Sequence, residues 1–169
     1  MKQIIYLLLI IFFISATSCT VDDQCRKDRT VEMIVGFHKK TIDSTTYLYT
    51  TSALSVDSLT VQGMDTLGTL IDSVLYKNVT ASIISLPLNK FVNKSKFLIT
   101  FKHITDTVSV LHTNTDVFLS LECGCLKVHS IDTVLTTNHY IDSVKISLHN
   151  VLNGNTTNAE NLQIYKTIK

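Results

Sequence analysis

The chain has 169 residues, a formal net charge of +1 and a composition dominated by Thr, Ser, Val, Ile and Leu. Balanced charge without a basic cluster excludes the electrostatic surface that nucleic-acid-binding proteins need. The length corresponds to one domain that is large enough to bury a core. The abundance of β-branched residues favours sheet over helix.

Residues 1–18 have the organisation of a secretory signal. Lys2 supplies a positive charge, and the uncharged apolar run 4–14 that follows is too short to span a bilayer as a helix. Small residues at 15–18 precede Cys19 and resemble the lipobox that the lipoprotein signal peptidase cleaves. We therefore predict a lipoprotein signal peptide over 1–18 and lipidation of Cys19. An ordinary secretory signal that ends near a cysteine is the alternative.

Residues 19–29 are predicted to form a tether between the lipid and the folded domain. One acyl chain anchors a protein only marginally, whereas the triacylated cysteine implied by the lipobox would hold it permanently. Asp22 and Asp23 resemble the acidic export tag of surface lipoproteins in Bacteroidetes-type bacteria. We expect a lipid-anchored cell-envelope protein, on the periplasmic or the surface face of the outer membrane.

Short stretches of alternating apolar residues recur through residues 30–169, with turn residues between them. In chain order, strands are predicted at 31–37, 47–50, 59–63, 73–76, 81–86, 97–101, 108–110, 117–125, 144–148 and 162–164. Pro87 ends the fifth of these or places it at a sheet edge. The pattern predicts a single all-β domain, an antiparallel β-sandwich, Ig-like or barrel-like, of about 8–10 short strands.

Three cysteines remain if Cys19 carries the lipid, and an envelope compartment permits disulfides. Cys25 can bond to either Cys123 or Cys125, and would link the tether to the predicted strand 117–125. A chain-entropy estimate gives such a long-loop bond at most about 4.7 kcal/mol of stabilisation. The third thiol stays free, bridges to another chain or reacts. A Cys-Gly-Cys redox centre is disfavoured because redox thiols usually lie at a helix N-terminus.

The histidines and the familiar catalytic motifs give no sign of a cofactor or metal site. A Gly-rich phosphate loop, a nucleophile elbow and a zinc-protease motif are absent from the sequence. No histidine lies two or four residues from another, so surface or edge positions are predicted for all six: His38, His103, His112, His129, His139 and His149. We expect no metal and no cofactor.

An Asp followed by Ser or Thr and then by an aliphatic residue or Thr recurs seven times. The tripeptide resembles the O-glycosylation sequon of exported proteins in Bacteroidetes-type bacteria. The candidate modified residues are Ser44, Ser58, Thr66, Ser73, Thr107, Thr133 and Ser143. The alternative interpretation is structural, because Asp and Ser or Thr make side-chain-to-backbone turns before strands.

Three short segments carry a resemblance to an uncharacterised family of small Bacteroidetes lipoproteins. They are Asp23-Gln24-Cys25, Leu86-Pro87-Leu88-Asn89 and Glu122-Cys123-Gly124. The resemblance implies location and fold but no activity. It favours a disulfide between Cys25 and Cys123 and leaves Cys125 free. Prolines expected after Cys25 are missing here, and Cys125 is an addition to the pattern.

The most economical functional prediction is a lipid-anchored binding or structural module without catalysis. Its partners would be the membrane, through the anchor, and envelope proteins or glycans, through sheet edges and loops. The alternative is an enzyme: a redox protein that uses Cys123 and Cys125, or a hydrolase whose site is assembled from loops.

Overall fold

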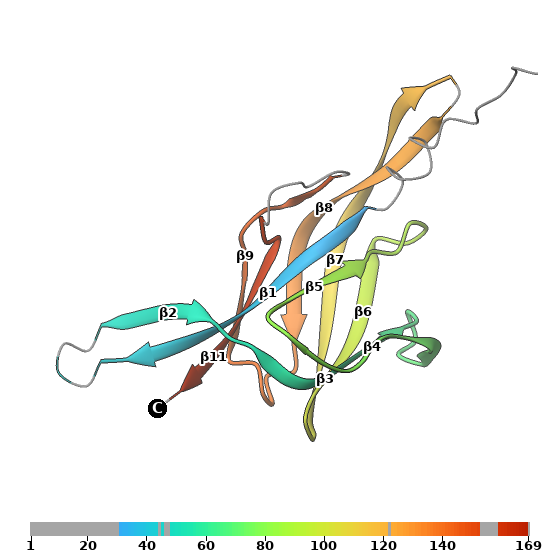
Figure 1. Cartoon of the computed structure of the whole chain (residues 1–169). Coiled ribbons are helices and arrows are strands. Elements are labelled where there is room, and N and C mark those ends of the chain that lie inside the picture. Colours follow the sequence, from blue (N-terminus) through green and yellow to red (C-terminus); the bar gives the residue numbers. More distant parts are fainter. Residues whose placement is uncertain (1–30, 44, 46–47, 122, 153–158, 169) are drawn as a thin grey trace, which may run out of the picture.

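The computed structural model describes residues 31–43, 45, 48–121, 123–152 and 159–168. The predicted signal peptide, Cys19, Cys25 and Ser44 lie outside these residues. Eleven strands and no helix occur in the described part of the chain, and it contains no helix able to cross a membrane (Figure 1).

The strands form two sheets that face one another. The five-stranded sheet contains β1 (Glu32–Ile42), β2 (Tyr49–Ala53), β5 (Ile83–Pro87), β9 (Ser143–Ile146) and β11 (Leu162–Ile168). The six-stranded sheet, in spatial order, contains β10 (Asn150–Val151), β8 (Gly124–Thr136), β7 (Ile104–Ser120), β6 (Lys94–Phe101), β3 (Val56–Met64) and β4 (Leu70–Ala81). Neither sheet closes on itself, so the predicted all-β sandwich is confirmed. β5 ends at Pro87, as predicted.

Strand β1 is the centre of the smaller sheet. One edge pairs in parallel with β11, while β5 and then β2 pair antiparallel along the other edge. Phe37 joins these two segments, because its N–H donates to Ser82 O and its carbonyl accepts from Leu54 N, both at 2.8 Å. The chain crosses between the sheets from β2 to β3 and again from β4 to β5, which ties the two layers together.

Alternation of apolar residues builds the core between the layers. Met33, Val35 and Phe37 of β1 are buried and face buried residues of β3, β6 and β7. The rings of Phe37 and Phe101 meet edge to face across the layers, with centroids 5.9 Å apart. Phe101 also stacks on Tyr140 at 4.2 Å. These inward faces agree with the sequence pattern.

A buried carboxylate, Asp106 on β7, fastens the segment that follows β8. Its Oδ1 accepts hydrogen bonds from Thr137 Oγ1 and His139 N, both at 2.7 Å. Its Oδ2 accepts from Tyr140 N at 2.7 Å and Ile141 N at 2.9 Å. Burial alone would raise the pKa of Asp106, but these hydrogen bonds outweigh it and the pKa is lowered. The carboxylate therefore stays charged and holds four donors.

Strands β7 and β8 continue beyond the sandwich as a two-stranded arm (Figure 1). β6 pairs with β7 only as far as Leu111, and β10 pairs with β8 only at His129 and Ser130. Beyond these pairs, the described arm consists of β7 paired with β8. The prediction of one strand over 117–125 is wrong, because β7 ends at Ser120 and β8 begins at Gly124. The alternation of apolar residues continues through the turn at Leu121 and Cys123, so the sequence pattern does not indicate that the chain reverses there. Gly124 adopts φ = 70°, a conformation that glycine takes at no steric cost.

Candidate functional site

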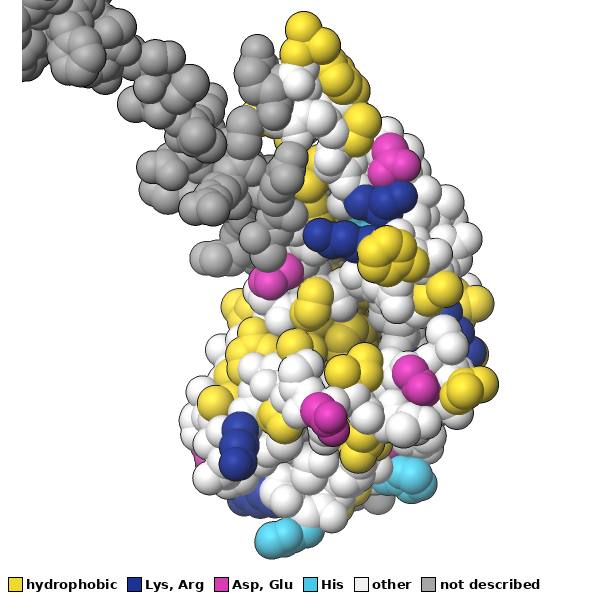
Figure 2. Space-filling model, turned by 90° about the vertical axis from the view of Figure 1, so that its right-hand side faces the viewer, with side chains coloured by type: hydrophobic (Ala, Val, Ile, Leu, Met, Phe, Trp, Pro, Cys, Tyr) yellow, Lys and Arg dark blue, Asp and Glu magenta, His cyan; other side chains and the backbone are white. Residues whose placement is uncertain are grey.

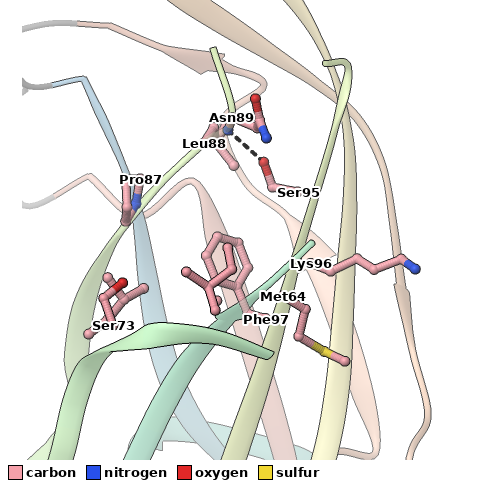
Figure 3. Close-up of a pocket in the computed structure, with 11 residues that line it drawn as sticks. Met64, Ser73, Pro87, Leu88, Asn89, Ser95, Lys96 and Phe97 are labelled. Carbon is pink, nitrogen blue, oxygen red and sulfur yellow. Dashed lines mark hydrogen bonds between the residues drawn. The ribbon is translucent and has the colours of Figure 1, made fainter. Parts of the chain in front are cut away.

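A cleft of about 230 Å³ opens between the two sheets, at the side where β4 and β5 face one another. Figure 3 shows Ser73 of β4 and Pro87 of β5 at the left, Phe97 at the centre and Ser95 with Asn89 at one end. The Lys96 side chain points away from the cavity in this view, and its Nζ donates to Thr66 O at 3.0 Å. The lining is mainly apolar and includes Met64, Ile71, Leu75, Pro87, Leu88 and Phe97.

One wall of the cleft is an edge strand. β4 ends the six-stranded sheet, and among the described residues no strand pairs with its outer edge. Ile71, Ser73 and Leu75 alternate along β4, which brings their side chains to the same face. Below the cleft, Tyr76 Oη donates to Ser85 O at 3.1 Å and accepts from Ser85 N at 3.0 Å. These two hydrogen bonds join β4 of one sheet to β5 of the other sheet, next to the cleft.

The polar end of the cleft continues into a buried network. Ser95 Oγ accepts from Asn89 N at 2.8 Å and lies 2.9 Å from His112 Nε2. His112 Nδ1 lies 3.0 Å from Asn114 Oδ1, and His129 Nδ1 lies 2.6 Å from the same oxygen. Because Asn114 Oδ1 only accepts, both histidines carry the proton on Nδ1 and Ser95 donates to His112 Nε2.

The prediction of surface or edge positions is wrong for two of the six histidines. His112 and His129 are 1% and 2% exposed, and their rings meet edge to face with centroids 5.2 Å apart. A signal in the sequence was available for His112, because it continues the inward alternation of Val108 and Val110. The same pattern was available for Ser95, which continues the inward alternation of Phe97 and Ile99 in β6. No local pattern marks Asn114 as the partner of these residues.

Burial also sets the charge of this histidine pair. Desolvation lowers the pKa of His112 and lowers that of His129 to about 4, with repulsion from His112, Lys90 and Lys127 adding to the shift at His129. Both rings are therefore neutral near pH 7. The Nε2 atom of His129 is buried without a hydrogen-bond partner in the described chain. No group of three or more His, Cys, Asp or Glu residues able to hold a metal ion occurs within the described residues.

The chain of contacts Ser95–His112–Asn114 has the order of a nucleophile, a base and the group that orients the base. Two features oppose that role. The Ser95 side chain is only 6% exposed, and its Oγ already accepts the N–H of Asn89. Asn114 Nδ2 also donates to the carbonyls of Asn89 and Val92, so the network fastens the loop between β5 and β6 to β7.

The two described cysteines, Cys123 and Cys125, lie at the end of the arm, away from the cleft. Cys125 on β8 carries a free, exposed thiol and lies opposite Phe118 of β7. Because Cys25 lies outside the described residues, its predicted bond to Cys123 stays a prediction. Cys125 lies in a strand. Redox-active thiols usually lie at the N-terminus of a helix, so the position of Cys125 does not support the redox alternative.

Most of the Asp-Ser/Thr tripeptides lie at the surface. Asp43 Oδ1 accepts from Thr45 N at 2.8 Å and Asp65 Oδ1 accepts from Thr69 N at 2.7 Å, so the turn interpretation is confirmed at these two. Glycosylation of any site stays a prediction. The described candidates that are exposed are Ser58, Thr66, Ser73 and Thr133, and those that are half-buried are Thr107 and Ser143.

Comparison with known proteins supplies a family but no activity. No curated protein and no solved structure matches the chain. A family model matches residues 58–166, from β3 to the last strand, and so includes the cleft, the buried network and the arm. This match extends over more than half of the sequence, and the chain therefore belongs to a family of unknown function (DUF6452).

Proposed function

We propose that the protein is a lipid-anchored module of the cell envelope that binds an extended segment of another envelope protein in the cleft beside β4. The observation that carries this proposal is an apolar cleft whose wall is a sheet edge that no described strand pairs with. An extended peptide can add to such an edge through main-chain hydrogen bonds and place alternate side chains in a pocket.

The size and lining of the cleft fit one large apolar side chain. An engineered apolar cavity of about 150 Å³ holds a benzene ring, and the cleft of about 230 Å³ is larger. A glycan ligand has less support, because sugar rings call for exposed aromatic side chains grouped in a patch. The large exposed aromatics of the described chain, Tyr49, Phe91 and Phe118, lie on three separate elements.

The anchor and the location have support from the sequence. The lipobox-like residues before Cys19, the acidic residues after it and the resemblance to Bacteroidetes lipoproteins all favour an outer-membrane lipoprotein. A non-catalytic role fits the buried network, which fastens the loop at one end of the cleft and makes a stable wall for it.

The test is a pair of neighbouring substitutions on β4 in the full-length protein purified in detergent. Peptides are first selected from a displayed random library, and we expect extended peptides with one large apolar residue. Ser73→Trp fills the cleft and should weaken binding by at least about tenfold. Asp72→Trp adds the same ring to the opposite face of β4 and should leave the dissociation constant unchanged.

A backbone control separates edge pairing from simple apolar contact. Methylation of alternate peptide nitrogens removes main-chain donors and should abolish binding in one of the two registers only. Failure to enrich any peptide, or equal loss of binding in the Ser73 and Asp72 variants, would contradict the proposal.

A hydrolase is the second candidate, and the Ser95–His112–Asn114 contacts are the observation that favours it. A fluorophosphonate probe, which labels activated serine nucleophiles, separates the two functions. A hydrolase requires labelling that Ser95→Ala removes. We expect no labelling, because the Oγ of Ser95 is buried and already bound to Asn89 N–H.

A further inference from the structure

The free end of the β7–β8 arm is apolar on both of its faces. Successive residues of a strand point to opposite sides, so Val117 and Leu119 lie on one face and Phe118 on the other. Phe118 is 62% exposed and Leu121, in the turn, is 91% exposed. We call Val117, Phe118, Leu119 and Leu121 the arm tip. Soluble monomers rarely expose such a continuous apolar patch unless something covers it.

Among the described residues of the arm, charged side chains appear only at its base. Lys127 Nζ and Asp116 Oδ1 form an ion pair at 2.9 Å, and Lys90 from the β5–β6 loop lies beside them. From these residues to the turn, every described side chain is uncharged. Figure 2 shows hydrophobic side chains at the upper end of the molecule and Lys or Arg side chains below them. An apolar end above a set of lysines is complementary to a phospholipid surface with anionic headgroups.

The described chain begins at the same end of the molecule. Glu32, at the start of β1, pairs with Pro87, and the loop that follows Pro87 bonds to Asn114 at the base of the arm (Figure 1). Eleven residues lie between Cys19 and Val31, so a fully extended chain places these two residues at most about 40 Å apart. The arm from Asn114 to Leu121 is about 24 Å long at 3.4 Å per residue. A lipid on Cys19 is therefore within reach of the arm tip.

We propose that the arm tip inserts into the headgroup region of the membrane that holds the lipid anchor. The proposal rests on the lipid anchor of the proposed function and adds an orientation to it. The tip enters about 5–10 Å into the boundary between headgroups and acyl chains. The turn also carries Glu122, which lies outside the described residues, so the proposal concerns headgroup depth and not a crossing of the hydrocarbon. The arm holds the sandwich away from the lipid.

The chain contains no tryptophan, so a single introduced indole reports one position. Phe118→Trp places the probe in the arm tip. Tyr49→Trp is the matched control on β2, because Tyr49 is 66% exposed and Phe118 is 62% exposed. Each full-length lipoprotein is reconstituted into vesicles of phosphatidylethanolamine and phosphatidylglycerol, with and without bromine on the acyl chains. We expect brominated lipid to reduce the Phe118→Trp emission by about twofold and to leave the Tyr49→Trp emission unchanged.

Flotation of the vesicles reports the anchor independently of the arm. If neither variant floats, the lipid anchor is wrong and the membrane proposal falls with it. If both float and brominated lipid quenches neither, the arm proposal alone is overturned. Blue-shifted but unquenched Phe118→Trp emission would place the tip against protein, either a second copy or another partner, and would also overturn the proposal.

Discussion

Strands β7 and β8 run through both the sandwich body and the arm, but their apolar side chains are buried in the body and exposed in the arm. In the body, Val108 and Val110 of β7 point into a core that covers them on all sides. In the arm, the apolar residues of the same strand are exposed, and no third strand or second sheet of the described chain covers them. The buried residues of the body stabilise the fold. The exposed residues of the arm contribute little to stability, and we propose that they contact a surface outside the chain. Comparing equal substitutions in the two regions tests this division.

A substitution of phenylalanine by alanine should lower the free energy of unfolding more in the body than in the arm. Phe101 is 2% exposed and contacts the rings of Phe37 and Tyr140, so Phe101→Ala should lower the free energy of unfolding by about 3–5 kcal/mol. Phe118→Ala in the arm should change it by less than about 0.5 kcal/mol. Denaturant unfolding of both variants measures the difference, and equal losses would contradict a division between body and arm.

A substitution of aspartate by asparagine should also destabilise the protein more in the body than in the arm. Asp106→Asn in the body loses the acceptor for Tyr140 N and Ile141 N and should cost about 3 kcal/mol. Asp116→Asn in the arm removes only an exposed ion pair with Lys127 and should cost less than about 1 kcal/mol. Thermal unfolding at pH 7 compares the two, and a tolerant Asp106 would remove the role given to it in the fold.

The buried histidine pair should make the body sensitive to mild acid. The pKa of His129 is about 4 in the folded protein and near 6.5 when unfolded. As the pH falls from 6.5 to 4, the unfolded chain binds a proton that the folded chain does not, so the stability present above pH 6.5 is lost. We expect a loss of roughly 3 kcal/mol, at about 1.4 kcal/mol for each unit of the pKa difference. His129→Phe should flatten the pH profile, whereas His103→Phe, at an exposed turn, should leave it as it is.

Local alternation was enough to predict much of the body. The residues 31–37, 97–101 and 108–110 occupy the strands and faces that their apolar pattern predicts. The local pattern did not predict which strands pair when they are far apart in the sequence. Nothing in the residues near Val35 or Leu162 indicates that β1 and β11 run in parallel, because their partnership depends on how the whole chain folds back.

The candidate site was harder to predict than the fold for the same reason. The cleft is formed by segments that are distant in sequence, and its network joins Ser95 to His112 across two strands. The arm turn was missed because Leu119, Leu121 and Cys123 continue an apolar alternation, and only Gly124 marks the reversal. Local patterns report which side chains face inward, whereas sites and turns depend on which segments meet.

The predicted lipid on Cys19 underlies both the proposed function and the proposed orientation of the arm, and the intact mass of the native protein tests this prediction most directly. The protein is purified from its own membranes without reductant and weighed before and after reduction. We predict the mass of residues 19–169 plus the lipid, with a gain of two hydrogens on reduction from the Cys25–Cys123 bond. Further mass in sugar-sized steps would add glycosylation. An unlipidated mass with cleavage elsewhere would contradict the anchor and, with it, the membrane-facing arm.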